Sequence, residues 1–280
     1  MLDRREFVWR VSAAAMAVPG PLLALSAALE AQVEIPSEFD TSLDSIAVAF
    51  RAGTATTMGY LSQPKKAGPY PGLVLLHDVA GLTAGTRGAA RNVATSGYAV
   101  VAPDFLSPQG GVASFRGVNA EVTKAIAAMT PAAVAPQAIG ALAFVKSHGG
   151  SGGRGTALVG FGWGATQAVL FAAGRSDVAA CVAFYPDPQR VLPVLAKTSA
   201  PVLAILAGDD PETKNSAERF AQVTVAGRHP HAAKVFAGMA RGFHDPGETK
   251  IYKPEPAKQA WATAIEHLDA HAKPASTTGA

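Results

Sequence analysis

Short apolar runs recur along most of the chain, and longer stretches of mixed apolar and polar residues separate them. A continuous apolar run of about four to eight residues between turn residues is typical of a strand that is buried on both faces. We predict such strands at 72–76 (GLVLL), 98–102 (YAVVA), 156–160 (TALVG), 179–185, 201–206 and 234–236. Two further short strands, 46–50 (IAVAF) and 57–61 (TMGYL), are predicted on either side of a glycine-containing turn.

Helices are predicted between these strands. They cover 86–96, 119–129, 136–146 and 258–272, and another helix follows the glycine-rich turn at 160–164. Strands that alternate with helices imply a mainly parallel, twisted sheet with helices on both faces, so the predicted fold class is α/β. In such sheets the functional side chains are expected on the loops that follow the carboxyl ends of the strands.

Composition and charge narrow the possible functions. The chain has 280 residues, of which 49% are hydrophobic and 16% are charged, so it can bury a large core. Its formal net charge is only +3, and no block of Lys and Arg follows the first ten residues. Nucleic acid is therefore not expected as a partner, although the sequence pI is about 9.0. A single cysteine, Cys181, excludes an internal disulfide.

The N-terminus has the pattern of an export signal. The segment DRREFVWR carries the adjacent Arg4 and Arg5, and a moderately apolar stretch follows. We predict a twin-arginine signal peptide at 1–31, a single domain at 32–272 and a flexible tail at 273–280. The expected location is the periplasm or the exterior. No other segment approaches the roughly 20 apolar residues that a membrane span needs, so no span is expected once the signal is removed.

The sequence GFGWGA at 160–165 poses the main functional question. It lies between a predicted strand and a predicted helix, which is the pattern of the nucleophile elbow of α/β-hydrolases. The central residue of such a turn is ordinarily Ser, Cys or Asp, but here it is Gly162. A backbone at an elbow is strained for any residue with a side chain, and glycine adopts it freely.

Motifs in the predicted loops resemble those of the dienelactone hydrolase family of α/β-hydrolases, over nearly all of residues 45–272. They occur in the order of that family: GYLSQP, PGLVLLHDVAGL, SGYAVVAPDF, VGFGWGA, VAFYP, PVLAILAGDD and GMARGFHDP. The resemblance implies the α/β-hydrolase fold. It also implies ester or lactone hydrolysis by a Cys or Ser nucleophile, a His base and an Asp that orients the base, with no cofactor and no metal.

The resemblance assigns each member of this triad to a position. The nucleophile falls on Gly162, and the base, which heads an H-G-F motif, falls on Arg241 of RGF. The acid falls on Asp209 or Asp210, of which we favour Asp210. An arginine cannot act as a base near neutral pH because its pKa exceeds about 12. Two of the three positions therefore lack the residue that hydrolysis requires.

The resemblance also supplies a candidate ligand-binding set. Asp78 matches an acidic residue that the family often has in this loop, and the backbone amides of Val79 and Trp163 match the oxyanion donors. The indole of Trp163 is a candidate to fill the space that Gly162 leaves empty. His77 and His244 are candidates to line the pocket, and Arg241 is a candidate to pair with Asp210 or to bind a carboxylate ligand.

Other candidate residues are weaker. Cys181 lies in an apolar run and is predicted to be a core residue. His229 and His231 form a pair without a third ligand, so no metal site is predicted.

Two functions remain open from the sequence. The first is an exported, non-catalytic protein that binds a small anionic ester, lactone or carboxylate. The second is an active ester or lactone hydrolase that uses an unusual constellation around His77 and His244. The sequence leaves the oligomeric state open.

Overall fold

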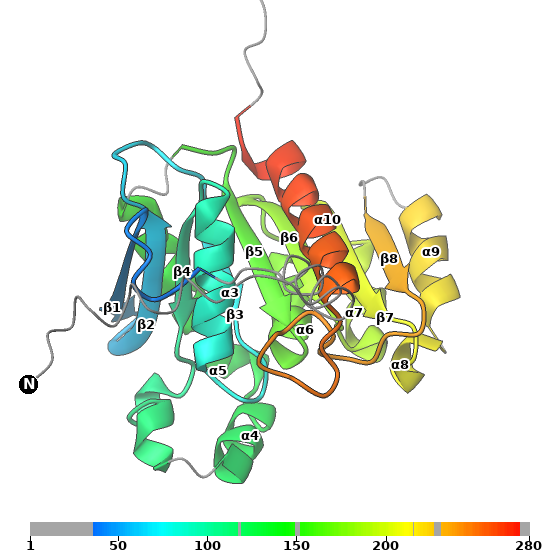
Figure 1. Ribbon diagram of the computed structural model, residues 1–280, viewed down its shortest axis with the longest axis horizontal. Helices are drawn as coiled ribbons and strands as arrows, with labels where there is room; N and C mark the ends of the chain where they lie inside the picture. Colours follow the sequence, from blue (N-terminus) through cyan, green and yellow to red (C-terminus); the bar gives the residue numbers. More distant parts are fainter. Residues whose placement is uncertain (1–35, 117–118, 149–151, 215, 227–230, 275–280) are drawn as a thin grey trace, which may run out of the picture. The chain divides into compact units, whose positions relative to one another are not determined.

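A mixed β-sheet runs through the centre of the fold (Figure 1). The computed structural model describes residues 36–116, 119–148, 152–214, 216–226 and 231–274. In this described part the sheet has eight strands in the order β1-β2-β4-β3-β5-β6-β7-β8. They are β1 (Leu43–Ala52), β2 (Ala55–Pro64), β3 (Gly72–Leu76), β4 (Ala99–Pro103), β5 (Thr156–Phe161), β6 (Val178–Phe184), β7 (Val202–Ala207) and β8 (Ala232–Phe236).

The strand directions confirm the predicted α/β class. Strand β2 pairs antiparallel with β1 and with β4, and the remaining neighbours pair parallel. Every residue of β3, β4, β5 and β7 is buried, as expected of parallel strands that are covered on both faces.

Helices flank this sheet. They are α3 (Ala84–Thr95), α4 (Asn119–Ala127), α5 (Pro131–Ser147), α6 (Trp163–Ala172), α7 (Pro188–Leu195), α8 (Pro211–Lys214), α9 (Ala217–Ala226) and α10 (Pro254–Ala272), with 3-10 turns η1 (Ser107–Gln109) and η2 (Val112–Phe115). In Figure 1, α3 and α10 cross the same face of the sheet. Helix α5 packs against β1, β3 and β4, whereas α6 packs against β5 and β6.

Two helices begin a full turn or more before their predicted starts, whereas α3 begins only slightly early, at Ala84. Helix α5 begins at Pro131 rather than at 136, because the side chain of Thr130 caps it and accepts a hydrogen bond from the amide of Ala133. Proline is well suited to the first helical turn, where its missing N–H has no helical acceptor. The same preference moves the start of α10 from 258 to Pro254. In α5, Pro136 lies inside the helix, so the sequence pattern does not indicate that the helix extends back to Pro131.

Strands β1 and β2 also extend beyond their predicted limits. They form a hairpin in which Leu43 pairs with Pro64 and Ala52 pairs with Ala55. The apolar pattern fades toward the open end of this hairpin because β1 is an edge strand with many exposed positions. The sequence therefore indicates only the middle of each strand.

The parallel strands bring their carboxyl ends together at one edge of the sheet. The loops that carry Asp78, Gly162, Tyr185 and Asp210 follow β3, β5, β6 and β7, which are consecutive neighbours in the sheet. Helix α6 approaches β3 closely at Gly164, where a Cβ atom would clash with the backbone carbonyls of Leu76 and His77. This close approach sets the first turn of α6 directly beside the loop after β3.

Part of the predicted domain organisation lies outside the described residues. This applies to the predicted signal peptide at 1–31 and to residues 275–280 of the predicted tail. Among the described residues no single helix is long and apolar enough to cross a membrane, while the bent pair α4 and α5 passes on length and composition together. The described residues also contain no group of three His, Cys, Asp or Glu side chains that could hold a metal ion.

Candidate active site

Gly162 occupies a sharp turn between β5 and α6. Its backbone has φ 52° and ψ −111°. Any residue with a side chain would be strained in this conformation. The amide of Gly162 donates to the carbonyl of Phe184 at 2.8 Å, and its carbonyl accepts from the Thr166 amide at 3.1 Å. The Thr166 hydroxyl also accepts a hydrogen bond from the amide of Asp187. The elbow is thus tied to both α6 and the loop after β6.

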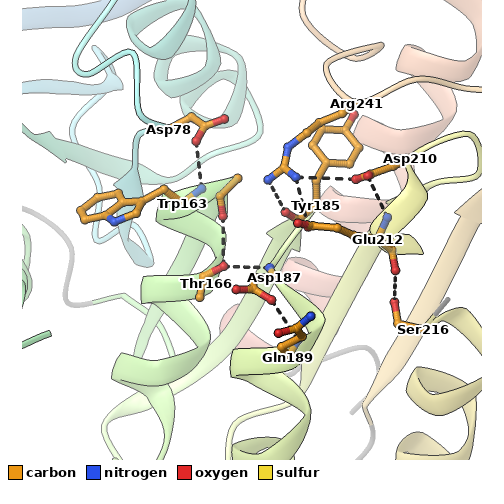
Figure 2. Close-up of polar contacts among 11 residues, drawn as sticks. Asp78, Trp163, Thr166, Tyr185, Asp187, Gln189, Asp210, Glu212, Ser216 and Arg241 are labelled. Atoms are coloured by element: carbon orange, nitrogen blue, oxygen red, sulfur yellow. Dashed lines mark hydrogen bonds and ion pairs between the residues drawn. The ribbon is translucent and has the colours of Figure 1, made fainter. Parts of the chain in front are cut away.

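The carboxylate of Asp78 fills the space above this turn. Its Oδ1 accepts a hydrogen bond from the amide of Val79 at 2.7 Å. The same oxygen accepts from the amide of Trp163 at 2.9 Å, as Figure 2 shows. A Cβ atom on Gly162 would clash with both carboxylate oxygens of Asp78. One side chain therefore takes up the two amides predicted as oxyanion donors and the volume that a nucleophile would need.

Trp163 does not fill the space beside Gly162, contrary to our expectation. Its indole packs instead against the rings of His77 and Phe105, at centroid distances of 6.0 and 5.6 Å. The backbone amide of Trp163 is the contribution of this residue to the elbow. Because that amide is the first of α6, it presents the positive end of the helix dipole to the Asp78 carboxylate.

Arg241 lies beside Asp210, as Figure 2 shows. Its Nη1 is 3.6 Å from Oδ2 of Asp210 and 3.5 Å from Oε2 of Glu212. Its Nη2 donates to the carbonyl of Tyr185 at 2.9 Å. Asp210 is buried, whereas Asp209 is exposed. The guanidinium thus bridges the loops after β6 and β7, with three oxygen atoms around it.

His77 holds the loop after β3 in place through hydrogen bonds to the backbone. Its Nδ1 lies 2.8 Å from the carbonyl of Asp78, and its Nε2 accepts from the amide of Phe105 at 3.4 Å. Because Nε2 is an acceptor, the proton of the neutral ring belongs on Nδ1. The side chain is fully buried, and burial lowers the pKa of His77 below its ordinary value. This ring has no free nitrogen to offer to a substrate.

His244 lies on the other side of the site. Its ring stacks on Phe161 at a centroid distance of 4.9 Å, and its Nδ1 is 3.0 Å from the hydroxyl of Tyr185. Burial lowers the pKa of His244 to about 3. The imidazole is therefore neutral at physiological pH and is a weak base.

A cavity of about 500 Å³ opens between the loop after β3 and the segment 241–251. Its charged lining consists of Asp78, Arg241, Asp245 and Glu248. Its aromatic lining consists of Phe161, Tyr185, His244 and Trp261. Among the residues predicted to bind a ligand, Asp78 and His244 line this cavity, whereas His77, Val79 and Trp163 lie outside its lining.

The sequence analysis missed several residues of this site. Tyr185 follows β6 directly in the motif VAFYP, so its place at a strand end was an available signal. Its φ of 57° is unusual for a residue with a side chain. Asp245 and Glu248 follow the RGF motif, and Trp261 comes from α10. No local pattern marks these three as site residues, because the fold of the 241–251 segment places Asp245 and Glu248, and the packing of α10 places Trp261.

The remaining candidates, Cys181 and His231, lie in the core of the fold and away from the cavity. Cys181 is fully buried in β6, and burial raises the pKa of its thiol to about 12, so it is a core residue as predicted. His231 accepts a hydrogen bond from the amide of Val202 and lies 3.1 Å from the carbonyl of Leu195. The other histidine of that pair, His229, lies outside the described residues.

The half-buried, neutral imidazole of His244 should make stability depend on pH. The unfolded chain takes up a proton on His244 below about pH 6.5, whereas the folded chain does so only near pH 3. We expect the free energy of unfolding to fall as the pH drops from 6.5 toward 3. Replacement His244→Gln should remove about 2–3 kcal/mol of the loss between pH 7 and pH 4.5.

Urea denaturation at these two pH values measures this effect. The matched control is His148→Gln, since His148 is exposed on the surface after α5. A His244→Gln variant that keeps the whole wild-type difference between pH 7 and pH 4.5 would contradict the assignment.

The sheet and the turn after β5 together define the class of protein. A mainly parallel eight-stranded sheet in the described residues, with a strand–turn–helix elbow at its centre, is the α/β-hydrolase fold.

Comparison with known proteins identifies the family. A profile described as the dienelactone hydrolase family matches residues 57–272. The chain belongs to this family.

Two relatives with similar sequences share one name. A protein of Methylorubrum extorquens named "Putative carboxymethylenebutenolidase" is 26% identical over 212 residues, which are 72% of this chain and 72% of that protein. A protein of the same name from Yersinia pestis is 25% identical, over 76% of this chain and 83% of that protein.

Solved structures agree on the fold. The structure of a "Putative Dienelactone Hydrolase" from Klebsiella pneumoniae has a TM-score of 0.71 and 22% identity, and covers 80% of this chain and 98% of that chain. A dienelactone hydrolase from Anabaena variabilis has a TM-score of 0.63 and 17% identity, with coverage of 82% and 99%.

Proposed function

We propose that this member of the dienelactone hydrolase family binds a small molecule in the cavity beside Asp78 without hydrolysing it. The observation that carries the proposal is the position of the Asp78 carboxylate. It accepts hydrogen bonds from the amides of Val79 and Trp163 and occupies the space next to Gly162. A fixed negative charge then stands where hydrolysis would develop one.

The loss of the two oxyanion donors to Asp78 is large enough to favour binding over catalysis. Removing a single oxyanion donor from a hydrolase costs about 10²–10³-fold in rate. Here one oxygen of Asp78 engages both candidate donors, and the carboxylate would also repel an incoming oxyanion. Gly162 supplies no nucleophile, and Arg241 supplies no base because its guanidinium stays charged.

An ester or lactone hydrolase built on His77 or His244 is the alternative. The names of the relatives favour it, since they describe a lactone-hydrolysing activity. The geometry around the two imidazoles argues against it. Both ring nitrogens of His77 have backbone partners, and the pKa of His244 is lowered to about 3 by burial. A general base works best when its pKa lies near the operating pH.

A hydrolysis assay on the wild-type protein separates the two functions. We expect no turnover of 4-nitrophenyl acetate or dihydrocoumarin above the rate given by His244→Ala and His77→Ala variants. A wild-type rate that is clearly above background and that His244→Ala abolishes would establish the hydrolase instead. Protein that has been unfolded and alkylated supplies the baseline for reaction with surface nucleophiles.

Export is a further part of the proposal. The support is the Arg4-Arg5 pair with the apolar stretch behind it, in a part of the chain outside the described residues. We expect the full chain to reach the periplasmic fraction of a host with a twin-arginine pathway. Changing Arg4→Lys and Arg5→Lys together should retain the protein in the cytoplasm, while the control Arg10→Lys should not.

A further inference from the structure

We infer that the cavity beside Asp78 selects a small organic cation, such as a quaternary ammonium compound, over a carboxylate. The inference deepens the proposed function, because it rests on ligand binding at the same site. It replaces the anionic ligand that the sequence suggested through Arg241.

The charges on the cavity wall favour a cation. Asp78, Asp245 and Glu248 contribute three carboxylates to the lining, and Arg241 contributes a single guanidinium. Like charges that are brought together in a partly enclosed site repel each other, so an anionic ligand would meet an unfavourable potential there.

Arg241 is poorly available to a carboxylate ligand. Its guanidinium already lies 3.6 Å from Asp210 and 3.5 Å from Glu212, and it donates to the carbonyl of Tyr185. These partners balance its charge and use part of its donor fork. A ligand carboxylate would have to compete with protein groups that are held on two loops.

Two of the carboxylates are fixed in place. Asp78 is held by the amides of Val79 and Trp163, and Oδ1 of Asp245 accepts from the amide of Gly247 at 2.8 Å. Hydrogen bonds that exist before a ligand arrives remove part of the entropy cost of binding. A cation would therefore meet preorganised negative charge from the loop after β3 and from the 241–251 segment.

Aromatic rings complete the wall. Phe161, Tyr185 and Trp261 line the same cavity, and all three rings are largely buried. The face of an aromatic ring carries partial negative charge and attracts cations, more strongly when water is excluded. The neutral imidazole of His244, which stacks on Phe161, adds no positive charge. The volume of about 500 Å³ lies within the usual range for small-molecule sites.

Three probes of one shape test the inference. They are choline, its uncharged isostere 3,3-dimethylbutan-1-ol and the anion 3,3-dimethylbutanoate. Calorimetric titration of the whole protein is expected to give at least tenfold tighter binding for choline than for the alcohol, and the weakest binding for the anion. Tryptophan fluorescence provides a second readout, because Trp261 lines the cavity.

Variants place the binding at this cavity. Asp245→Asn and Asp78→Asn are each expected to weaken choline at least fivefold while leaving the alcohol almost unchanged. The control Asp44→Asn removes an exposed carboxylate from the edge strand β1 and should have no effect. Circular dichroism and a thermal melt check that each variant is folded.

The outcomes separate this inference from the proposed function. If choline binds no more tightly than the alcohol, or if the anion binds best, the cation inference is overturned whatever the hydrolysis assay gives. Unchanged affinity for choline in both the Asp78→Asn and the Asp245→Asn variant also overturns it. Turnover of 4-nitrophenyl acetate by the wild type would overturn the proposed function, even where choline binds as expected.

Discussion

Replacing Gly162 with cysteine is expected to lower the free energy of unfolding by about 2–5 kcal/mol. One part of the cost is backbone strain, because a residue with a side chain would be held at φ 52° and ψ −111°. The other part comes from Asp78, whose carboxylate overlaps with the new Cβ. If that carboxylate moves away, the amides of Val79 and Trp163 lose their acceptor.

Urea denaturation of three variants separates these contributions. Gly53→Cys is the control for backbone strain, since Gly53 has φ 63° and a Cβ there would meet no atom within 4 Å. Gly162→Cys should cost clearly more than this control. The double change Asp78→Ala with Gly162→Cys should cost less than the two single changes added together, because the clash can occur only once. Strictly additive costs would show that Asp78 does not oppose a side chain at this turn.

Hydrolysis by a Cys-His-Asp triad at this site is expected to require the removal of Asp78. The triple variant Asp78→Ala, Gly162→Cys, Arg241→His should turn over 4-nitrophenyl acetate at least about 10²-fold above the background rate measured with the wild type, the low end of what a positioned general base contributes. It supplies a thiol at the elbow, and an imidazole at position 241 would face the buried Asp210. It also frees the amides of Val79 and Trp163 for an oxyanion.

The double variant Gly162→Cys with Arg241→His is the matched comparison. We expect it to be at least tenfold slower than the triple variant, because Asp78 still competes for both amides. Adding Asp210→Asn to the triple variant should reduce turnover, as expected if Asp210 orients the imidazole. A double variant that is as fast as the triple one would show that the Asp78 carboxylate does not block the site.

The sequence predicts the centre of the fold better than its margins. Strand β3 was predicted with the bounds that the structure gives it, because a strand buried on both faces is uniformly apolar between turn residues. The hairpin of β1 and β2 was predicted too short, since an edge strand has no such uniform pattern. Helix α5 was predicted to begin at 136, whereas the cap at Thr130 and the proline at 131 start it earlier.

The site illustrates a different limit. The motif GFGWGA was enough to place Gly162 at a turn between a strand and a helix. The sequence could not show that Asp78 would enter that turn, because its rotamer depends on the absence of a Cβ atom on a residue far along the chain. The same holds for Glu212, which reaches Arg241 only because the segments after β7 and β8 are neighbours.

The fit between Gly162 and Asp78 has a consequence for how such a protein could change over generations. A mutation that introduces a nucleophile at position 162 meets the carboxylate of Asp78, and a mutation of Asp78 alone leaves the amides of Val79 and Trp163 without an acceptor. Each first step is therefore expected to lower stability before any activity can appear. A lineage that gained a nucleophile at position 162 would have to cross a fitness valley, so the fit between Gly162 and Asp78 acts as an evolutionary ratchet.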